Sequence, residues 1–228
     1  TVLADFDLRV EKGETFVIIG QSGIGKTVAL RHVAGLIEPD SGEVIIDGVR
    51  INGATKDVKK RLREKMGVLF QSGALLNYMS VAENVALPLE ERRLLPRKEI
   101  ERLVDEKLAL LQLSDAKHKA IPDISGGMKK RVALARVLMT NPEIILWDEP
   151  TTGLDPVMSS VINELIRRMQ REFDVTSLVV THDMKSALYV GDRIGMLFAG
   201  RLIEVNTPQG IRNSANPVVR QFIDGRLE

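Results

Sequence analysis

A glycine-rich stretch near the start of the sequence has the residue types that bind phosphate groups. It consists of Gly20, Gln21, Ser22, Gly23, Ile24, Gly25, Lys26 and Thr27. Glycines let the backbone curl so that successive N–H groups point inward, and a helix that begins there adds partial positive charge. Lys26 supplies a point charge for β- and γ-phosphates, and the Thr27 hydroxyl is a ligand for Mg²⁺. The alternative, a chance glycine turn with an exposed lysine, is disfavoured because a strand pattern precedes the stretch and a helical pattern follows it.

Two carboxylates follow a second apolar run, residues 144–147. Ligands of open α/β sheets bind at the carboxyl ends of the strands, so Asp148 and Glu149 are expected beside the glycine-rich stretch. Asp148 would reach Mg²⁺, usually through water, and Glu149 would polarise a water for attack on the γ-phosphate. Alone, such a pair is more often a solvated turn. Together with the glycine-rich stretch, it predicts nucleotide hydrolysis.

Two more polar residues stand at the ends of strand-like runs. Gln71 follows residues 68–70, and His182 follows residues 177–181. Gln71 would bind Mg²⁺ and sense the nucleotide, and the alternative is a polar residue that opens a loop. His182 would sense the γ-phosphate and orient the attacking water, and the alternative is a satisfied histidine at a strand end.

The elements that carry these residues alternate between strands and helices. Apolar runs rich in β-branched residues are typical of strands buried on both faces of a parallel sheet. They cover residues 15–19, 144–148 and 177–182. We expect a helix over 156–173, an edge hairpin strand over 43–48 and a terminal hairpin over 194–204. Residues 8–10 alternate in polarity, as in a further strand. The sequence therefore predicts an α/β fold with a mainly parallel core sheet and an antiparallel β edge region.

Residues 80–141 have a helical pattern without a clear strand. Ser80 and Glu83 fit a capping box, which marks the start of a helix. We therefore predict a helical subdomain over 80–141, inserted in a core formed by 1–79 and 142–228.

Composition excludes several classes of function. Lys and Arg number 32 against 31 Asp and Glu, and this balance leaves no global electrostatic footprint for nucleic acid. Cysteine is absent from the sequence, which excludes disulfides, zinc-thiolate sites and thiol catalysis. No apolar run approaches the ~20 residues of a membrane-spanning helix.

The order and spacing of the singled-out residues resemble those of an ABC-transporter ATPase subunit over essentially the whole chain. In that family the motifs are the Walker A loop, the Q-loop, the signature, Walker B with a catalytic glutamate, the D-loop and the switch histidine. They correspond here to 20–27, Gln71, 124–128, 144–149, 154–155 and His182. The resemblance implies a P-loop NTPase fold of the ABC ATPase type, with ATP and Mg²⁺ as ligands.

The resemblance also implies roles for individual residues. Catalysis is assigned to Glu149, His182 and Lys26, and Mg²⁺ binding to Thr27, Gln71 and Asp148. The nucleotide would be bound by Gly20, Gln21, Ser22, Gly23, Ile24, Gly25, Lys26, Thr27 and Thr152 of one chain, and in trans by Ser125, Gly126, Gly127, Met128 and the D-loop residue Asp155.

The signature residues also have a physical interpretation of their own. The Ser125 hydroxyl and the N–H groups of Gly126 and Gly127 precede a helical pattern, which makes a second anion site. The alternative is a helix-capping turn. The resemblance implies that this site closes over the γ-phosphate held by another copy, so that a homodimer encloses two ATP molecules.

Finer features resemble the ATPases of Mla-type phospholipid transporters, which are associated with MCE proteins. They are Met128 where Gln is commonest, residues 72–75, residues 151–156 and the 221–222 tail. The resemblance implies phospholipid transport that maintains outer-membrane lipid asymmetry. It also implies a peripheral subunit at the cytoplasmic face of the bacterial inner membrane. The implied partners are a permease of the MlaE type, an MCE-domain protein and a small regulatory subunit, with no nucleic acid.

Other functions stay open at this stage. Fold and chemistry also suit another importer or exporter, for amino acids or lipoproteins, although Met128 and residues 72–75 favour lipid. A non-transport ABC protein usually has two cassettes or a long coiled coil, and this sequence has neither pattern. A nucleotide-gated scaffold without hydrolysis is a further alternative, and intact Glu149 and His182 argue against it. Residues 74–79 are a candidate permease contact, with ordinary packing between subdomains as the alternative. Phe6, Phe16 and Trp147 are interpreted as core residues, and the adenine-stacking aromatic is expected upstream of Thr1.

Overall fold

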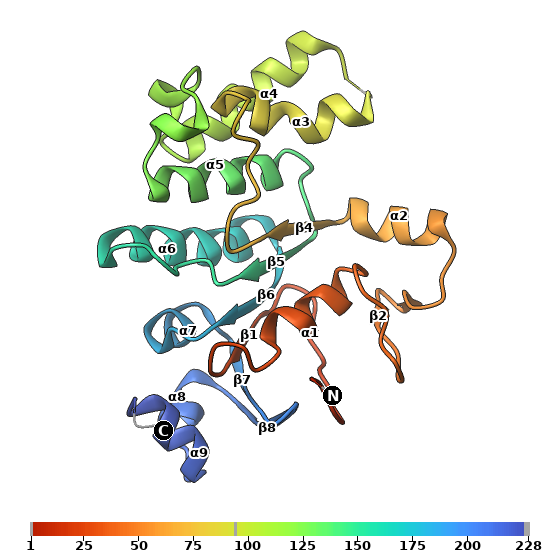
Figure 1. Cartoon of the computed structure of the whole chain (residues 1–228), viewed down its shortest axis with the longest axis vertical. Coiled ribbons are helices and arrows are strands. Elements are labelled where there is room, and N and C mark those ends of the chain that lie inside the picture. Colours follow the sequence, from red (N-terminus) through yellow and green to blue (C-terminus); the bar gives the residue numbers. More distant parts are fainter. Residues whose placement is uncertain (1, 94, 226–228) are drawn as a thin grey trace.

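A six-stranded sheet in the order β4-β5-β6-β1-β7-β8 organises the computed structural model, which describes residues 2–93 and 95–225 (Figure 1). The strands are β4 (Met66–Leu69), β5 (Ile144–Asp148), β6 (Thr176–Thr181), β1 (Thr15–Ile19), β7 (Arg193–Phe198) and β8 (Arg201–Asn206). Neighbouring strands from β4 to β7 are parallel, and β8 is antiparallel to β7. The predicted mainly parallel sheet with an antiparallel edge is confirmed.

The central strands are buried on both faces, as their β-branched composition predicts. All five residues of β1 are buried. Val17 and Ile19 pack into one apolar cluster, and Phe16 and Ile18 pack into another on the opposite face. Trp147 in β5 is fully buried, and its Nε1 donates to Ser177 Oγ at 3.1 Å. The interpretation of Phe16 and Trp147 as core residues is therefore confirmed.

Helices flank the strands and the loops that leave them. They are α1 (Lys26–Val33), α2 (Lys56–Glu64), α6 (Pro156–Phe173), α7 (Met184–Val190), α8 (Pro208–Arg212) and α9 (Pro217–Ile223). The bounds of α6 are those expected from the sequence. Asp155 caps α6 by accepting from Val157 N at 2.9 Å and Met158 N at 3.0 Å, and Pro156 is the first helical residue.

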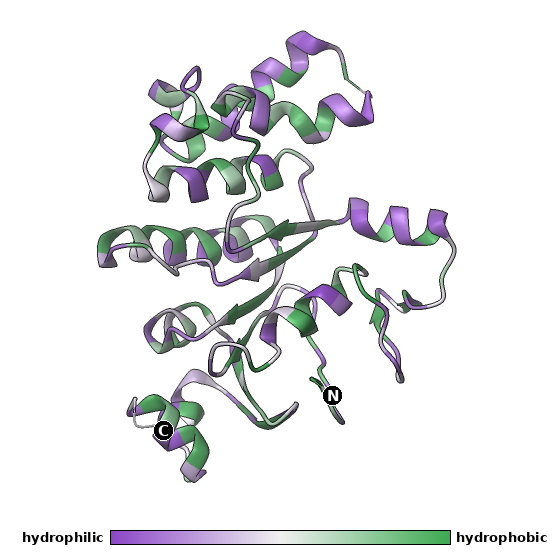
Figure 2. Cartoon of the chain, viewed as in Figure 1, coloured by the Kyte–Doolittle hydropathy of each residue, from purple (hydrophilic) through white to green (hydrophobic). Residues whose placement is uncertain are grey.

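A group of helices lies beyond the β4 side of the sheet (Figure 1). It contains α3 (Val81–Arg92), α4 (Arg97–Leu110) and α5 (Gly126–Leu138), with two 3₁₀ turns at Ser114–Ala116 and Ile121–Asp123. Helix α3 packs on both α4 and α5. Figure 2 shows polar residues over much of α4, in contrast to the apolar strands. The expected capping box is present, because Ser80 N donates to Glu83 at 2.7 Å while Ser80 Oγ accepts from Glu83 N at 3.3 Å.

One expected strand is absent from the described residues. Residues 8–10 form no strand. Their alternation still predicts the buried face correctly, since Phe6, Leu8 and Val10 pack on the apolar cluster around Phe16. The other antiparallel pair is the short hairpin β2 (Ile45–Ile46) and β3 (Val49–Arg50). In the part of the chain that the structure covers, no helix has the length and apolar character needed to cross a membrane.

Candidate nucleotide-binding site

The glycine-rich loop joins β1 to α1 at the carboxyl edge of the sheet. Gly25 is the N-cap of α1, with φ 113° and no side-chain cap hydrogen bond. A side chain at this φ would be strained, and a Cβ atom would lie 2.8 Å from the Val2 side chain. The first N–H groups of α1 therefore have no side-chain acceptor at the cap, which leaves them available to an anion.

Lys26 is held at the centre of this loop. It is only 5% exposed, and its Nζ donates to Gly20 O at 2.7 Å and Gln21 O at 2.9 Å. The same atom lies 3.4 Å from Glu149 Oε1. Burial lowers the pKa of Lys26, and the negative charge of Glu149 opposes that shift. The loop thus concentrates a buried ammonium group where phosphates would lie.

Thr27 and Asp148 form a second pair beside Lys26. Thr27 Oγ1 donates to Asp148 Oδ1 at 2.9 Å. Burial raises the pKa of Asp148, whereas the hydrogen bond from Thr27 lowers it. Among the described residues, no group of three or more His, Cys, Asp or Glu side chains could hold a metal ion. One hydroxyl and one carboxylate still suit Mg²⁺, which takes few protein ligands and completes its shell with water and phosphate oxygens.

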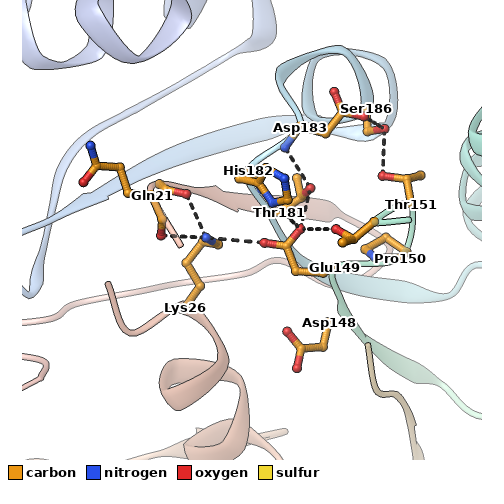
Figure 3. A network of polar contacts seen from close by, with 12 residues as sticks. Gln21, Lys26, Asp148, Glu149, Pro150, Thr151, Thr181, His182, Asp183 and Ser186 are labelled. Carbon is orange, nitrogen blue, oxygen red and sulfur yellow. Dashed lines mark hydrogen bonds and ion pairs between the residues drawn. The ribbon is translucent and has the colours of Figure 1, made fainter. Parts of the chain in front are cut away.

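The Glu149 carboxylate is surrounded by donors, with one oxygen facing Lys26 and the other facing the end of β6 (Figure 3). Glu149 Oε2 accepts from Thr152 Oγ1 at 3.0 Å and from Thr181 Oγ1 at 3.2 Å. His182 Nδ1 lies 2.9 Å from the same oxygen. We call Lys26, Glu149, Thr152, Thr181 and His182 the Glu149 cluster.

The charge of Glu149 is set by opposing effects. Burial alone would raise its pKa, but the hydrogen bond from His182 and the charge of Lys26 outweigh burial and hold the pKa below its ordinary value. The carboxylate is therefore ionised at neutral pH. An ionised carboxylate only accepts hydrogen bonds, so His182 Nδ1 carries the proton in this contact.

Gln71 lies at the same edge of the sheet but outside these contacts. Leu69 pairs with Trp147, so the parallel register places Gln71 level with Glu149. Its side chain is exposed, and no hydrogen bond in the described part of the chain joins it to Thr27 or Asp148. The structure thus brings Gln71 to the expected edge and shows no metal-ligand pair for it.

The signature residues lie apart from the glycine-rich loop. Ser125 caps α5 by accepting from Met128 N at 3.2 Å, and both Ser125 and Gly126 are exposed. Figure 1 shows α5 and α1 separated by β5 and α6. The expected second anion site therefore lies on a different part of the surface from the glycine-rich loop.

Two residues that contact Glu149 were not predicted from the sequence. Thr181 is level with Glu149 because Asp148 pairs with Val180, and this register is the signal that would have found it. Lys130, on α5, donates to the backbone carbonyls of Glu149, Pro150 and Thr152. Its targets are main-chain atoms about twenty residues away, which no side-chain motif reveals.

The parallel sheet, the glycine-rich loop and the acids at the end of β5 define a P-loop nucleotide-binding protein. Residues 3–152 match the family model described as ABC transporter. The chain belongs to the ABC transporter family, as an ATPase cassette.

Curated relatives cover nearly all of this chain. The probable ribonucleotide transport ATP-binding protein mkl of Mycobacterium tuberculosis is 42% identical over 222 residues, which are 97% of this chain and 62% of that protein. The chain thus spans less than two thirds of the mycobacterial relatives' length. The intermembrane phospholipid transport system ATP-binding protein MlaF of Escherichia coli is 37% identical over 224 residues, 98% of this chain and 83% of that protein.

Solved structures share the fold. A dimeric ATP-binding cassette in a post-hydrolysis state, bound to ADP and Pi, superposes with a TM-score of 0.84 at 34% identity, covering 91% of this chain and 90% of that one. The chain cbiO1 of Clostridium perfringens, part of an ABC transporter complex, has a TM-score of 0.83 at 30% identity and covers 99% of this chain and 92% of its own.

Proposed function

We propose that this chain binds and hydrolyses ATP as a homodimer and powers phospholipid transport. The observation that carries the ATPase part is the Glu149 cluster, in which an ionised carboxylate lies 3.4 Å from the Lys26 ammonium and 2.9 Å from His182 Nδ1. The Glu149 carboxylate, the Lys26 ammonium group and the His182 imidazole lie close together at the carboxyl edge of the sheet, where nucleotides bind in such folds. They would act as a base, a cation and a group that orients water.

Binding would use the glycine-rich loop. Its N–H groups and Lys26 would hold the β- and γ-phosphates, while Thr27, Asp148 and Gln71 would hold Mg²⁺, which neutralises phosphate charge when bound. Lys26 is paired with Glu149 in the free chain. We expect phosphate oxygens to replace that contact, because Lys26 donates best to the denser negative charge.

Hydrolysis would use the carboxylate released from Lys26. Glu149 would accept a proton from a water as the water oxygen bonds to the γ-phosphorus, while the bond to the β–γ bridging oxygen breaks and ADP leaves. His182 would orient that water and contact the γ-phosphate. The hydroxyls of Thr152 and Thr181 hold the carboxylate in place, since both donate to Oε2.

The separation of the two expected anion sites supports the proposed homodimer. Ser125, Gly126, Gly127 and Met128 would bind the γ-phosphate held by the other copy, with Asp155 at the same interface. Support comes from the dimeric cassette that the chain resembles at 34% identity. In this proposal residues 80–141 move as a helical subdomain against the core.

Phospholipid is the proposed substrate because the E. coli phospholipid transport ATPase is matched over 98% of this chain and 83% of its own length. The mycobacterial ribonucleotide transport relatives are more identical, at 42%, but only 62% of their length is covered. Ribonucleotide transport is therefore the second candidate. The proposed partners are an MlaE-type permease, an MCE-domain protein and a small regulatory subunit, at the cytoplasmic face of the inner membrane.

A loop held by hydrogen bonds supports the proposed permease contact at residues 74–79. The buried Asn84 accepts from Leu76 N at 2.8 Å and donates to Leu76 O at 3.0 Å, and Tyr78 is 84% exposed beside it. Leu75, however, packs on the large apolar cluster. The expectation that these apolar residues lack a core partner is wrong for Leu75, so the proposed contact centres on Tyr78.

A pull-down tests the substrate and the partners. The bait is the Glu149→Gln variant with ATP, in detergent-solubilised membranes, and wild type with ADP is the control. Recovery of a polytopic permease, an MCE-domain protein and phospholipid would support the proposal. Recovery of a permease with a solute-binding protein would refute phospholipid as the substrate. Recovery of ribosomes or DNA-bound proteins would refute a role in transport.

A further inference from the structure

Lys130 on α5 reaches the backbone turn that follows β5. Its Nζ donates to Glu149 O at 3.2 Å, to Pro150 O at 3.0 Å and to Thr152 O at 2.6 Å. A lysine ammonium group has three N–H donors and no acceptor, so three carbonyls satisfy it completely. Glutamine offers two donors and methionine none, which makes lysine the fitting residue for this turn.

The turn that Lys130 holds has an unfavourable backbone. Glu149 has φ 49°, in the left-handed region that side chains other than glycine seldom occupy. Glu149 N donates to Val180 O at 2.9 Å, which fixes one side of the peptide. Lys130 fixes the other side, because three carbonyls that converge on one point repel each other without a cation between them.

Lys130 also stands close to the signature. It lies on α5, five residues after the N-cap Ser125. The start of α5 approaches the D-loop as well, since a Cβ atom on Gly127 would lie 3.9 Å from the Leu154 side chain, and 3.4 Å from that of Met158 on α6. The helix that presents the second anion site is therefore attached to the turn that aims Glu149.

We propose that Lys130 is a positioning residue that couples the anion site at Ser125–Gly127 to the Glu149 carboxylate of the same chain. This inference rests on the proposed ATP-driven homodimer, in which those two groups serve different nucleotides. When the partner's γ-phosphate draws in the start of α5, Lys130 moves with the helix and carries the Glu149 turn. Closure of the dimer over one nucleotide thereby positions the Glu149 carboxylate that acts on the other nucleotide.

Steady-state hydrolysis and ATP titration by the full-length protein test the positioning role. Lys130→Met removes all three donors at similar length, and Lys130→Gln restores two. The control Lys98→Met removes the same charge from an exposed position on α4. We expect kcat to fall about 10- to 100-fold in Lys130→Met and less in Lys130→Gln, because small displacements of a catalytic group have effects of this size. ATP affinity should stay within about twofold.

The coupling itself is tested in the Glu149→Gln background, where loss of the carboxylate already stops hydrolysis. Adding Lys130→Met should raise the ATP concentration needed for dimerisation about fivefold or more, as measured by analytical ultracentrifugation. Unchanged dimerisation would overturn the coupling. Equal loss of kcat, ATP affinity and thermal stability in Lys130→Met would show a merely structural role. If the wild-type protein does not hydrolyse ATP, the proposed function itself is refuted. If the wild-type protein hydrolyses ATP and Lys130→Met has the same kcat, only the positioning role of Lys130 is refuted.

Discussion

The Glu149 cluster and the start of α5 use polar groups in opposite ways. The Glu149 carboxylate is buried, and its described contacts are all supplied by its own chain: Lys26, Thr152, Thr181 and His182. Ser125 at the start of α5 is exposed, and its described contact is the cap on its own helix. In the proposed homodimer, the buried cluster would activate water, and the exposed start of α5 would bind the γ-phosphate held by a second copy.

The strongest test of this contrast removes the base. Glu149→Gln keeps the shape and the capacity to accept hydrogen bonds but cannot take a proton. We expect kcat to fall about 10³-fold, within the usual range for a general base, while ATP binding is retained. Phosphate release and calorimetric titration measure the two quantities. Hydrolysis at the wild-type rate would remove Glu149 from its proposed role, and Glu143→Gln is a matched surface control.

The next effect concerns the cation of the same cluster. Lys26→Ala removes the buried ammonium group that would donate to the phosphates. We expect ATP affinity to fall about 10- to 100-fold, as for loss of a charge-assisted hydrogen bond. Unchanged affinity in a direct titration would refute the proposed contact.

Mixed dimers sharpen the comparison, because the two regions should act on different nucleotides. Ser125→Asp keeps an oxygen that can cap α5 but places negative charge against the γ-phosphate. Lys26→Ala and Ser125→Asp chains should each be inactive alone. Mixed, half of the dimers have one intact site, so at most about a quarter of the activity should return, and coupling through Lys130 would lower that fraction. If the mixture forms ATP-dependent dimers no more readily than either variant alone, the signature does not act in trans as proposed.

The smallest expected effect is on stability against pH. The folded-state pKa of Glu149 lies below its ordinary value. Ionised Glu149 therefore contributes stability above the unfolded glutamate pKa of about 4.3, and this contribution is lost as pH falls through the lower folded pKa. The Tm of wild type should exceed that of Glu149→Gln at neutral pH, and the difference should close in acid. A difference that grows in acid would contradict the direction of the shift.

The sequence was sufficient for those parts of the molecule whose chemistry lies in consecutive residues. The β-branched runs of β1, β5 and β6 predicted the buried parallel sheet, and the helical pattern over 156–173 predicted α6. Contacts between distant segments were missed. Lys130 binds carbonyls 19 to 22 residues away, and a carbonyl has no sequence signature. The strand expected at 8–10 was wrong because alternation predicts a face but not a partner strand.

The relatives agree on the ATPase family but differ in the cargo that their names give. The family model and the two solved cassettes agree on an ABC ATPase. The relatives differ in what their names say is transported, phospholipid in one and ribonucleotide in another. Both relatives are named as ATP-binding proteins, so likeness at the nucleotide site does not separate the two cargoes. Selectivity for cargo would lie in the permease, which the proposed contact around Tyr78 would couple to ATP.

The left-handed backbone of Glu149 also bears on how stability is distributed at this turn. A residue with a Cβ atom at φ 49° loses about 1–2 kcal/mol of folding free energy, which glycine would recover. Glu149→Gly should relieve this strain, but it also removes the carboxylate that stabilises the folded chain at neutral pH. The contacts of the side chain thus hold a backbone conformation that the turn would otherwise avoid, and position 149 is strained because of the chemistry placed there.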